Sequence, residues 1–163
     1  MMNISAQKEM YSLAMISSLA AVAGVKCEFT SSVDDDSIDG RWYRAGGAAP
    51  EIHFQAKFHG MDDPLCCDFL YPLKMKNYDD LRRETINPRV LLLVVASKSS
   101  HKWLKFGAES VSLSRLTFYK SLRGYPASKN ATVETLNIPF ANVIRPDLIV
   151  QMLNNVEETG VIA

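Results

Sequence analysis

The sequence has few cysteines, and their spacing indicates neither a disulfide framework nor a metal cluster. Among 163 residues there are three, Cys27, Cys66 and Cys67, and no pair forms a Cys-x-x-Cys motif. Adjacent cysteines such as Cys66 and Cys67 rarely bond to each other, because a disulfide requires a separation and orientation that neighbours seldom reach. This cysteine usage is typical of a reducing compartment, so we expect a cytoplasmic protein.

Long apolar runs are also absent. No stretch reaches the ~18 residues of a membrane span, so we expect no contact with a membrane. Residues 11–25 resemble the apolar part of a signal peptide, which leaves a secreted domain as an alternative. Their apolar side chains recur at helical spacing, however, and Lys8-Glu9 is a poor signal-peptide start. We therefore predict a helix over residues 6–23, with Ser5 as its N-cap and Gly24 at its end.

Neither sign of charge is in excess over the whole chain. There are 18 basic and 18 acidic residues, which argues against a strongly basic protein that binds nucleic acid non-specifically. The charges are unevenly distributed, because residues 1–68 carry a net charge of −5 and residues 98–129 carry +6. An acidic half beside a basic half suits a phosphodiester substrate. The alternative is an ordinary solvated surface with scattered lysines.

What the sequence does contain is enough hydrophobic residues for one compact domain. They make up 47% of the chain, and the length suits a single domain over residues 1–163. Residues 89–96 are apolar and predict a strand buried on both faces. Other strands are predicted over residues 26–31, 38–44, 50–58, 68–74, 117–122 and 132–138, and other helices over residues 77–83, 100–106 and 147–156. This order predicts an α/β or α+β domain with a mixed central sheet flanked by helices. Pro72 places the strand over 68–74 at an edge.

The strand over residues 50–58 has one apolar face and one chemically rich face. Its residues alternate without a break, which is the period of a β-strand. The apolar side carries Ile52, Phe54, Ala56 and Phe58, and the polar side carries Glu51, His53, Gln55 and Lys57. The other predicted elements would support and complete this polar row.

A carboxylate on the preceding strand can complete that row. Residues 45–50 predict a hairpin loop, which would bring Asp39 beside Gln55 and Lys57. Oxygen atoms from Asp39 and Gln55 suit Mg²⁺, which prefers hard oxygen ligands. An amine at Lys57 can orient an attacking water and neutralise charge on a phosphorane. Together these groups predict metal-assisted phosphodiester hydrolysis.

Two short motifs resemble a known nuclease superfamily. Ser37-Ile38-Asp39-Gly40 and Ile52-His53-Phe54-Gln55-Ala56-Lys57 are similar to the Gln-x-Lys variant of PD-(D/E)xK nucleases, found in Mrr-like restriction endonucleases. The rest of the chain resembles an uncharacterised prokaryotic family, domain of unknown function 4365, which is grouped with these nucleases. The matching pieces are Lys8-Glu9-Met10, Tyr71-Pro72-Leu73-Lys74, Lys76-Asn77-Tyr78-Asp79-Asp80-Leu81-Arg82, Pro88-Arg89-Val90-Leu91, His101-Lys102-Trp103-Leu104, Tyr119, Ser121-Leu122-Arg123-Gly124 and Ile138-Pro139-Phe140.

The resemblance implies a restriction-endonuclease-like core and a nuclease dependent on Mg²⁺ or Mn²⁺. Asp39 and Gln55 would hold the metal with help from Glu9 on the first helix, and Lys57 would position the water. The substrate would be nucleic acid, with DNA expected, and the role would be prokaryotic defence against foreign DNA. The size and neutral charge suggest a homodimer or a subunit of a larger defence complex.

Simpler interpretations of the same residues remain open. Glu9 can complement the helix dipole, Asp39 can be a turn residue, and Lys57 can be an exposed strand lysine. Lys120 and Arg123 are candidates for phosphate contacts, or they lie on a solvated face. Gln55 replaces the acidic residue of most PD-(D/E)xK members, which favours the alternative of a catalytically weakened nuclease fold. Such a protein would be a nucleic-acid-binding or protein-binding module in a defence complex.

Overall fold

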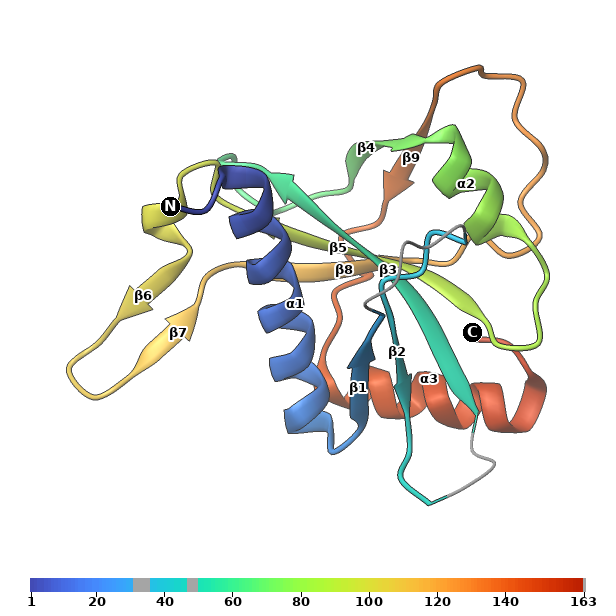
Figure 1. Ribbon diagram of the computed structural model, residues 1–163, viewed down its shortest axis with the longest axis horizontal. Coiled ribbons are helices and arrows are strands. Elements are labelled where there is room, and N and C mark those ends of the chain that lie inside the picture. The colour runs from blue at the N-terminus through green and yellow to red at the C-terminus, as the bar shows by residue number, and fades with distance from the viewer. Residues whose placement is uncertain (31–35, 47–49, 163) are drawn as a thin grey trace.

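A mixed β-sheet forms the centre of the molecule in a computed structural model that describes residues 1–30, 36–46 and 50–162 (Figure 1). Within these residues the sheet has five strands in the order β1-β2-β3-β5-β8. β3 and β5 run parallel, and every other neighbouring pair is antiparallel. The strands are β1 (Lys26–Phe29), β2 (Gly40–Tyr43), β3 (Glu51–Gly60), β5 (Arg89–Ala96) and β8 (Leu116–Lys120).

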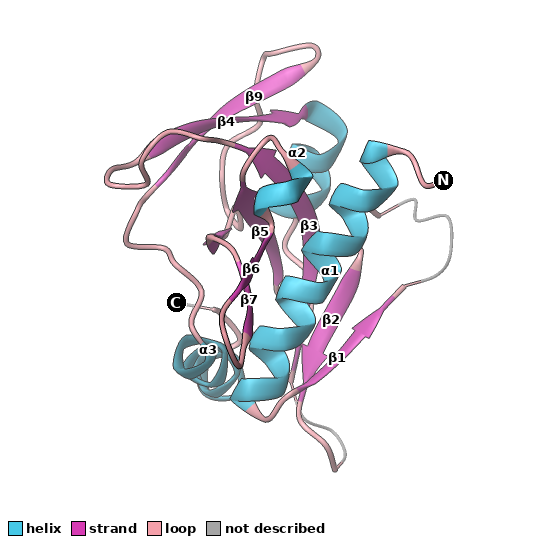
Figure 2. Cartoon of the chain, turned by 90° about the vertical axis from the view of Figure 1, so that its left-hand side faces the viewer, coloured by secondary structure: helices cyan, strands magenta, loops and turns pink. Residues whose placement is uncertain are grey.

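Different elements cover the two faces of this sheet. The helices α1 (Ile4–Ala23) and α3 (Pro146–Thr159) pack on one face. The helix α2 (Met75–Arg82) and a separate pair of antiparallel strands, β4 (Phe69–Lys74) and β9 (Val133–Ile138), pack on the other. The two layers are visible in Figures 1 and 2. The predicted mixed central sheet flanked by helices is therefore confirmed.

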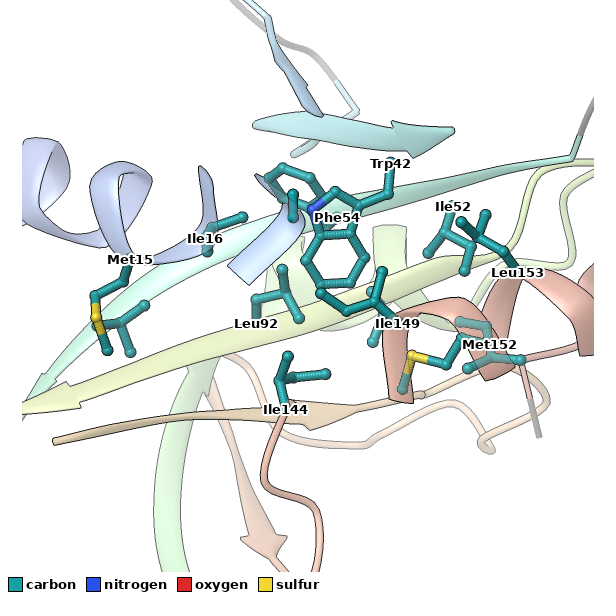
Figure 3. Close-up of a cluster of buried hydrophobic side chains, with 14 of the residues drawn as sticks. Met15, Ile16, Trp42, Ile52, Phe54, Leu92, Ile144, Ile149, Met152 and Leu153 are labelled. Carbon is teal, nitrogen blue, oxygen red and sulfur yellow. The ribbon is translucent and has the colours of Figure 1, made fainter. Parts of the chain in front are cut away.

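β5 joins the two hydrophobic cores, because its side chains alternate between them. Leu92 packs with the α1 and α3 side, together with Phe54 and Trp42, as Figure 3 shows. Leu91 and Leu93 point to the α2, β4 and β9 side. The prediction of a strand buried on both faces is thus confirmed, since all residues from Val90 to Ala96 are buried.

The first helix begins two residues earlier than predicted. Asn3, and not Ser5, is the N-cap, and its Oδ1 accepts a hydrogen bond from the Ala6 N–H at 2.9 Å. The left-handed Gly24, with φ of 70°, ends the helix as predicted. The segment that resembles a signal peptide packs into the core, where Ile16 is fully buried. In the part of the chain that the structure describes, no helix is long and apolar enough to span a membrane.

The predicted helix over residues 100–106 is wrong. A single 3-10 turn, η1 (Ser100–Lys102), is followed by β6 (Leu104–Phe106), which pairs with an unpredicted strand, β7 (Val111–Leu113). The cause is Trp103, whose side chain is buried and whose indole Nε1 donates to the Ser97 carbonyl at 2.7 Å. This anchor ends the turn, and the chain continues as an extended hairpin.

The other boundaries differ only slightly from the predictions. β4 pairs with β9 alone, so Pro72 lies in an edge strand as predicted. α2 begins at Met75, two residues before its predicted start, and α3 extends three residues past its predicted end. Residue 31 and part of the loop over 45–50, at residues 47–49, lie outside the described residues. All three cysteines, each of them described, are free.

Candidate nuclease site

A hollow of about 400 Å³ between α1 and the central sheet contains three of the four predicted catalytic residues. Glu9 comes from α1, Asp39 precedes β2, and Lys57 belongs to β3. The complete lining is Ser5, Lys8, Glu9, Ser12, Leu13, Phe29, Thr30, Asp39, Ala56, Lys57 and Phe58. The fourth residue, Gln55, is not part of this lining.

The hollow exists because β2 is shorter than β3. β2 begins at Gly40, which pairs with Phe54 of β3. β3 continues from Phe54 to Gly60, and β2 does not pair with this last part of the strand. Gly40 also allows three strands to meet closely. A Cβ atom there would lie 2.4 Å from the Glu28 carbonyl oxygen and 2.6 Å from the Phe54 ring. The glycine after Asp39 is therefore a packing requirement of this corner.

Asp39 is held against β3 by its backbone and its side chain. Its N–H donates to the Phe54 carbonyl at 2.9 Å, and its Oδ2 accepts from the Ala56 N–H at 2.7 Å. Its own carbonyl accepts from the Thr30 N–H at 3.0 Å. These contacts fix the position and orientation of the Asp39 carboxylate at the edge of β3.

Gln55 lies between the two residues that bind Asp39, and its side chain is buried. Only 2% of Gln55 is exposed, and its Oε1 has no hydrogen-bond partner among the described residues. A buried amide oxygen without a partner is costly and requires an explanation, such as a ligand that occupies it. The polar side of β3 is therefore not uniformly exposed to solvent, because at Gln55 the core formed with α2, β4 and β9 covers that face of the sheet.

Lys57 and Glu9 differ in their environments. Lys57 is half-buried, and among the described residues its amine has no hydrogen-bond or ion-pair partner. Glu9 is exposed at the rim, in contrast to Ile16 on the inward side of the same helix. A cation without a partner beside a fixed carboxylate is typical of a site that receives an anionic substrate.

The other two polar residues of the β3 row bind each other, away from the hollow. Glu51 Oε1 accepts from the Arg41 guanidinium at 2.8 Å, and its Oε2 lies 3.2 Å from His53 Nε2. Partial burial raises the pKa of Glu51, but the hydrogen bonds to His53 and Arg41 outweigh it and hold that pKa below its ordinary value. Glu51 is therefore a partner of Arg41.

A buried polar cluster just before Asp39 was missed by the sequence reasoning. Ser37 has a φ of 59° and donates through its Oγ to Asp80 Oδ2 at 2.7 Å. Asp80 on α2 is buried and also binds Lys76 at 3.1 Å and Arg83 at 3.2 Å. The cluster ties α2 to the segment that carries Asp39. Its sequence signal is the presence of both acidic and basic residues in α2, which ordinarily indicates a solvated surface.

The two predicted phosphate-binding residues do not line the hollow. Lys120 Nζ lies 5.4 Å from the centre of the Tyr125 ring. The Arg123 guanidinium donates to the Gly160 carbonyl at 3.0 Å, at the end of α3. Their role as phosphate ligands stays a prediction.

The oxygen atoms of the three predicted metal ligands fit Mg²⁺ or Mn²⁺ in kind, although they are few. Asp39 supplies a carboxylate and Gln55 an unpartnered amide oxygen, both hard ligands, and Glu9 can supply a second carboxylate from the rim. Within the described residues, no three His, Cys, Asp or Glu side chains form a group that could hold a metal ion. A cation here would therefore keep several waters, which Mg²⁺ commonly does.

Comparisons with known proteins show a structural likeness but no match in sequence. No protein-family model and no curated protein matches the sequence, so the resemblance to domain of unknown function 4365 stays a prediction. A crystal structure of a Holliday junction resolvase from the archaeal hyperthermophile Archaeoglobus fulgidus is similar to this chain. The two structures superpose with a TM-score of 0.45 and share 8% sequence identity. The match covers 80% of this chain and 84% of the resolvase chain. Similarity this weak carries no argument about activity, and the site is interpreted from its own residues.

Proposed function

We propose that this protein is a divalent-metal-dependent nuclease of the PD-(D/E)xK type. The observation that supports this function best is the shared hollow of Glu9, Asp39 and Lys57. Gln55, whose buried Oε1 has no hydrogen-bond partner among the described residues, precedes Lys57 by two residues on the same strand. The resemblance of the Asp39 and Gln55-x-Lys57 motifs extends the proposal to DNA as substrate. It also extends the proposal to a restriction-endonuclease-like core and to a role in prokaryotic defence.

Each residue would have a distinct task in the hydrolysis. Asp39 and Gln55, with Glu9, would hold Mg²⁺ or Mn²⁺, which supplies a Lewis acid next to the scissile phosphate. Lys57 would hold the attacking water and neutralise charge that develops on the phosphoryl oxygens. The bond from the Ala56 N–H, one residue before Lys57, keeps the Asp39 carboxylate on the β3 edge. The site therefore has an oriented carboxylate and an amine on the same strand edge.

The test is a cleavage assay on plasmid, single-stranded DNA and RNA with Mg²⁺, Mn²⁺ or EDTA. We expect metal-dependent cleavage that falls about 100-fold or more in Lys57→Ala, because one transition-state charge contact is lost. Asp39→Asn keeps a hydrogen-bond acceptor for the Ala56 N–H. A loss of cleavage in this variant similar to that in Lys57→Ala would therefore result from the lost charge and not from a disturbed fold. Lys26→Ala, on exposed β1, is the matched control and should cleave as well as the wild type. Equal cleavage by all three variants would show that the site is elsewhere.

A second candidate function has a specific observation in its favour. The described residues near the hollow hold fewer carboxylates than a tight Mg²⁺ site requires, and Glu9 is exposed at the rim. A nuclease fold weakened in this way would bind nucleic acid or a protein partner within a defence complex. If this second function is correct, the wild type should bind nucleic acid but cleave none of the substrates with either metal. Lys57→Ala should then leave the substrates as uncut as the wild type does.

A further inference from the structure

The hairpin of β6 and β7 presents an apolar face to solvent. Its register pairs Phe106 with Val111 and Leu104 with Leu113, so these side chains share one face. Phe106 is 77% exposed, and Leu104 and Val111 are exposed too. The hairpin extends away from the main sheet at the left of Figure 1. A two-stranded hairpin is marginally stable alone, and its apolar side chains ordinarily need a surface to pack on. Apolar side chains that gather on one exposed face are typical of an interaction site.

The base of the hairpin is fixed firmly to the body of the protein. The Tyr11 hydroxyl donates toward the Trp103 and Ser114 carbonyls, each at 2.9 Å, and the Ser114 N–H donates to the Trp103 carbonyl at 2.8 Å. Trp103 also packs on Phe58, with ring centres 5.2 Å apart. Because Phe58 lines the candidate site, the hairpin is anchored in part against a residue of that site's wall.

Basic side chains surround this base. A second hollow of about 440 Å³ is lined by Lys102, Lys105 and Arg115, with Asp62 as its acidic member. The complete lining is Asp62, Ser97, His101, Lys102, Leu104, Lys105, Ser114 and Arg115. Lys102 and Lys105 are exposed, whereas the Arg115 guanidinium donates to the Asp62 and Asp63 carbonyls at 2.8 and 2.9 Å. The two lysines are therefore the cations available to a ligand.

The charge of this region favours a polyanion over a second copy of the chain. Residues 98–129 carry seven basic residues and one acidic residue, Glu109. A symmetric dimer through the hairpin would bring the same cations of both copies together, which is unfavourable. β3 and the two residues after it lead from the first hollow to the second, because Asp62 follows Lys57 by five residues, a span of at most about 18 Å. One nucleic-acid strand can therefore reach both.

We propose that the hairpin is a nucleic-acid contact, in which Phe106 stacks on an unpaired base while Lys102 and Lys105 bind the neighbouring phosphates. This inference rests on the substrate class of the proposed function, and it is independent of cleavage. Aromatic stacking tolerates any base, because every base has a π-face, and lysines contact phosphates without reading sequence. The surface would thus position single-stranded or distorted nucleic acid and would not select a sequence.

The experiment measures binding of the full chain to labelled single-stranded and duplex DNA in EDTA, where metal-dependent cleavage is absent. We expect Phe106→Ala to weaken single-strand binding roughly 5- to 150-fold, with an unchanged dependence on salt. Phe106→Trp should retain affinity, and Phe106→Leu should lose it as Phe106→Ala does. Ile86→Ala is the matched control, because Ile86 is 98% exposed and lies outside the hairpin.

The phosphate contacts have a different signature. The double variant Lys102→Ala/Lys105→Ala should bind more weakly and reduce the salt slope by about 1.4 for a single strand, because two counterion-releasing contacts are lost. Lys129→Ala, an exposed lysine in the loop before β9, should leave the slope unchanged.

Several outcomes would overturn the inference while leaving the nuclease proposal intact. These are equal binding by the hairpin variants and the wild type, retained affinity in Phe106→Leu, and dissociation of a dimer by Phe106→Ala in sedimentation. Loss of affinity only for anionic vesicles would likewise overturn the inference and assign the surface to lipid. A wild type that binds no nucleic acid would contradict both the inference and the nuclease proposal. Conversely, hairpin-dependent binding without cleavage supports the inference and contradicts the enzyme.

Discussion

Gln55 places a neutral amide where a carboxylate would bind a divalent cation more tightly. It is buried beside Asp39, and its Oε1 is unpartnered among the described residues. A buried amide is easier to accommodate than a buried charge, so the chain is more stable without a metal than a carboxylate would allow. If the site binds a metal as proposed, the same amide would hold the cation more weakly than a carboxylate, and the proposed activity would depend on this balance.

Replacing Gln55 with glutamate tests this balance directly. In EDTA, we expect Gln55→Glu to lower the melting temperature by roughly 3–10 °C, because a charge is buried without a partner. Saturating Mn²⁺ should restore stability, by about 2.7 kcal/mol when the metal is at 100 times its dissociation constant. Thermal melts with and without Mn²⁺ measure both effects. Gln55→Leu is the control and should not respond to Mn²⁺, and an equal lack of response in Gln55→Glu would contradict a metal site.

At the scale of elements, α2 supports the site from outside it. The helix is short and lacks a side-chain cap, yet it contributes buried Asp80 to the cluster with Ser37. Burial raises the pKa of Asp80, but hydrogen bonds from Ser37 and Lys76 outweigh it and hold that pKa below its ordinary value. The charged carboxylate is thus stabilised in the folded state, and α2 is held against the turn that leads into Asp39.

Removing this carboxylate should cost far more stability than removing its exposed partner. We expect Asp80→Ala to lower the free energy of unfolding by about 1–3 kcal/mol, because the Ser37 hydroxyl loses the nearer of its two acceptors, Asp80 Oδ2 at 2.7 Å, and keeps only Asn77 Oδ1 at 3.1 Å. Lys76→Ala should cost under about 1 kcal/mol, since the Lys76 side chain is 61% exposed. Urea titrations of the two variants measure the difference. Equal costs would show that Asp80 is held by its ion pairs alone.

The same carboxylate makes a pH-dependent contribution. Because the folded pKa of Asp80 is below the unfolded value, its stabilisation is present above about pH 4 and is lost as pH falls through the folded pKa. Urea midpoints measured from pH 5 to pH 3 should therefore fall less steeply in Asp80→Ala than in the wild type.

The molecule as a whole consists of two hydrophobic cores that share one strand. Both tryptophans, Trp42 and Trp103, lie in the core beneath α1 and α3. Leu91 lies in the other core, on the opposite face of β5. Because β5 belongs to both, the chain should unfold as one unit.

A substitution in the core without tryptophan tests this coupling. Leu91→Ala should cost about 2–5 kcal/mol, as expected for a fully buried leucine. It should shift the urea midpoint of tryptophan fluorescence as much as that of far-ultraviolet circular dichroism. Leu70→Ala, at an exposed residue of β4, is the control and should shift neither. A fluorescence midpoint that stays at its wild-type value would show that the two cores unfold separately.

Local patterns were sufficient to predict most elements of this protein. Alternation identified β3, the apolar run identified β5, and Gly24 identified the end of α1, because these signals depend on neighbours in the sequence. The pairing of β2 with β3 followed from the loop between them, and it placed Asp39 beside Gln55. How these residues act stays a prediction.

Only the tertiary structure decided which polar residues are buried and where the chain adopts a secondary structure that differs from the one its local pattern predicts. Gln55 and Asp80 look like surface residues in the sequence, but the α2, β4 and β9 layer covers the first and Ser37 binds the second. The hairpin after Trp103 replaced a predicted helix, because that side chain packs against Tyr11 and Phe58, which are distant in sequence. Burial by distant segments leaves no periodic signal, and for that reason the sequence alone did not reveal it.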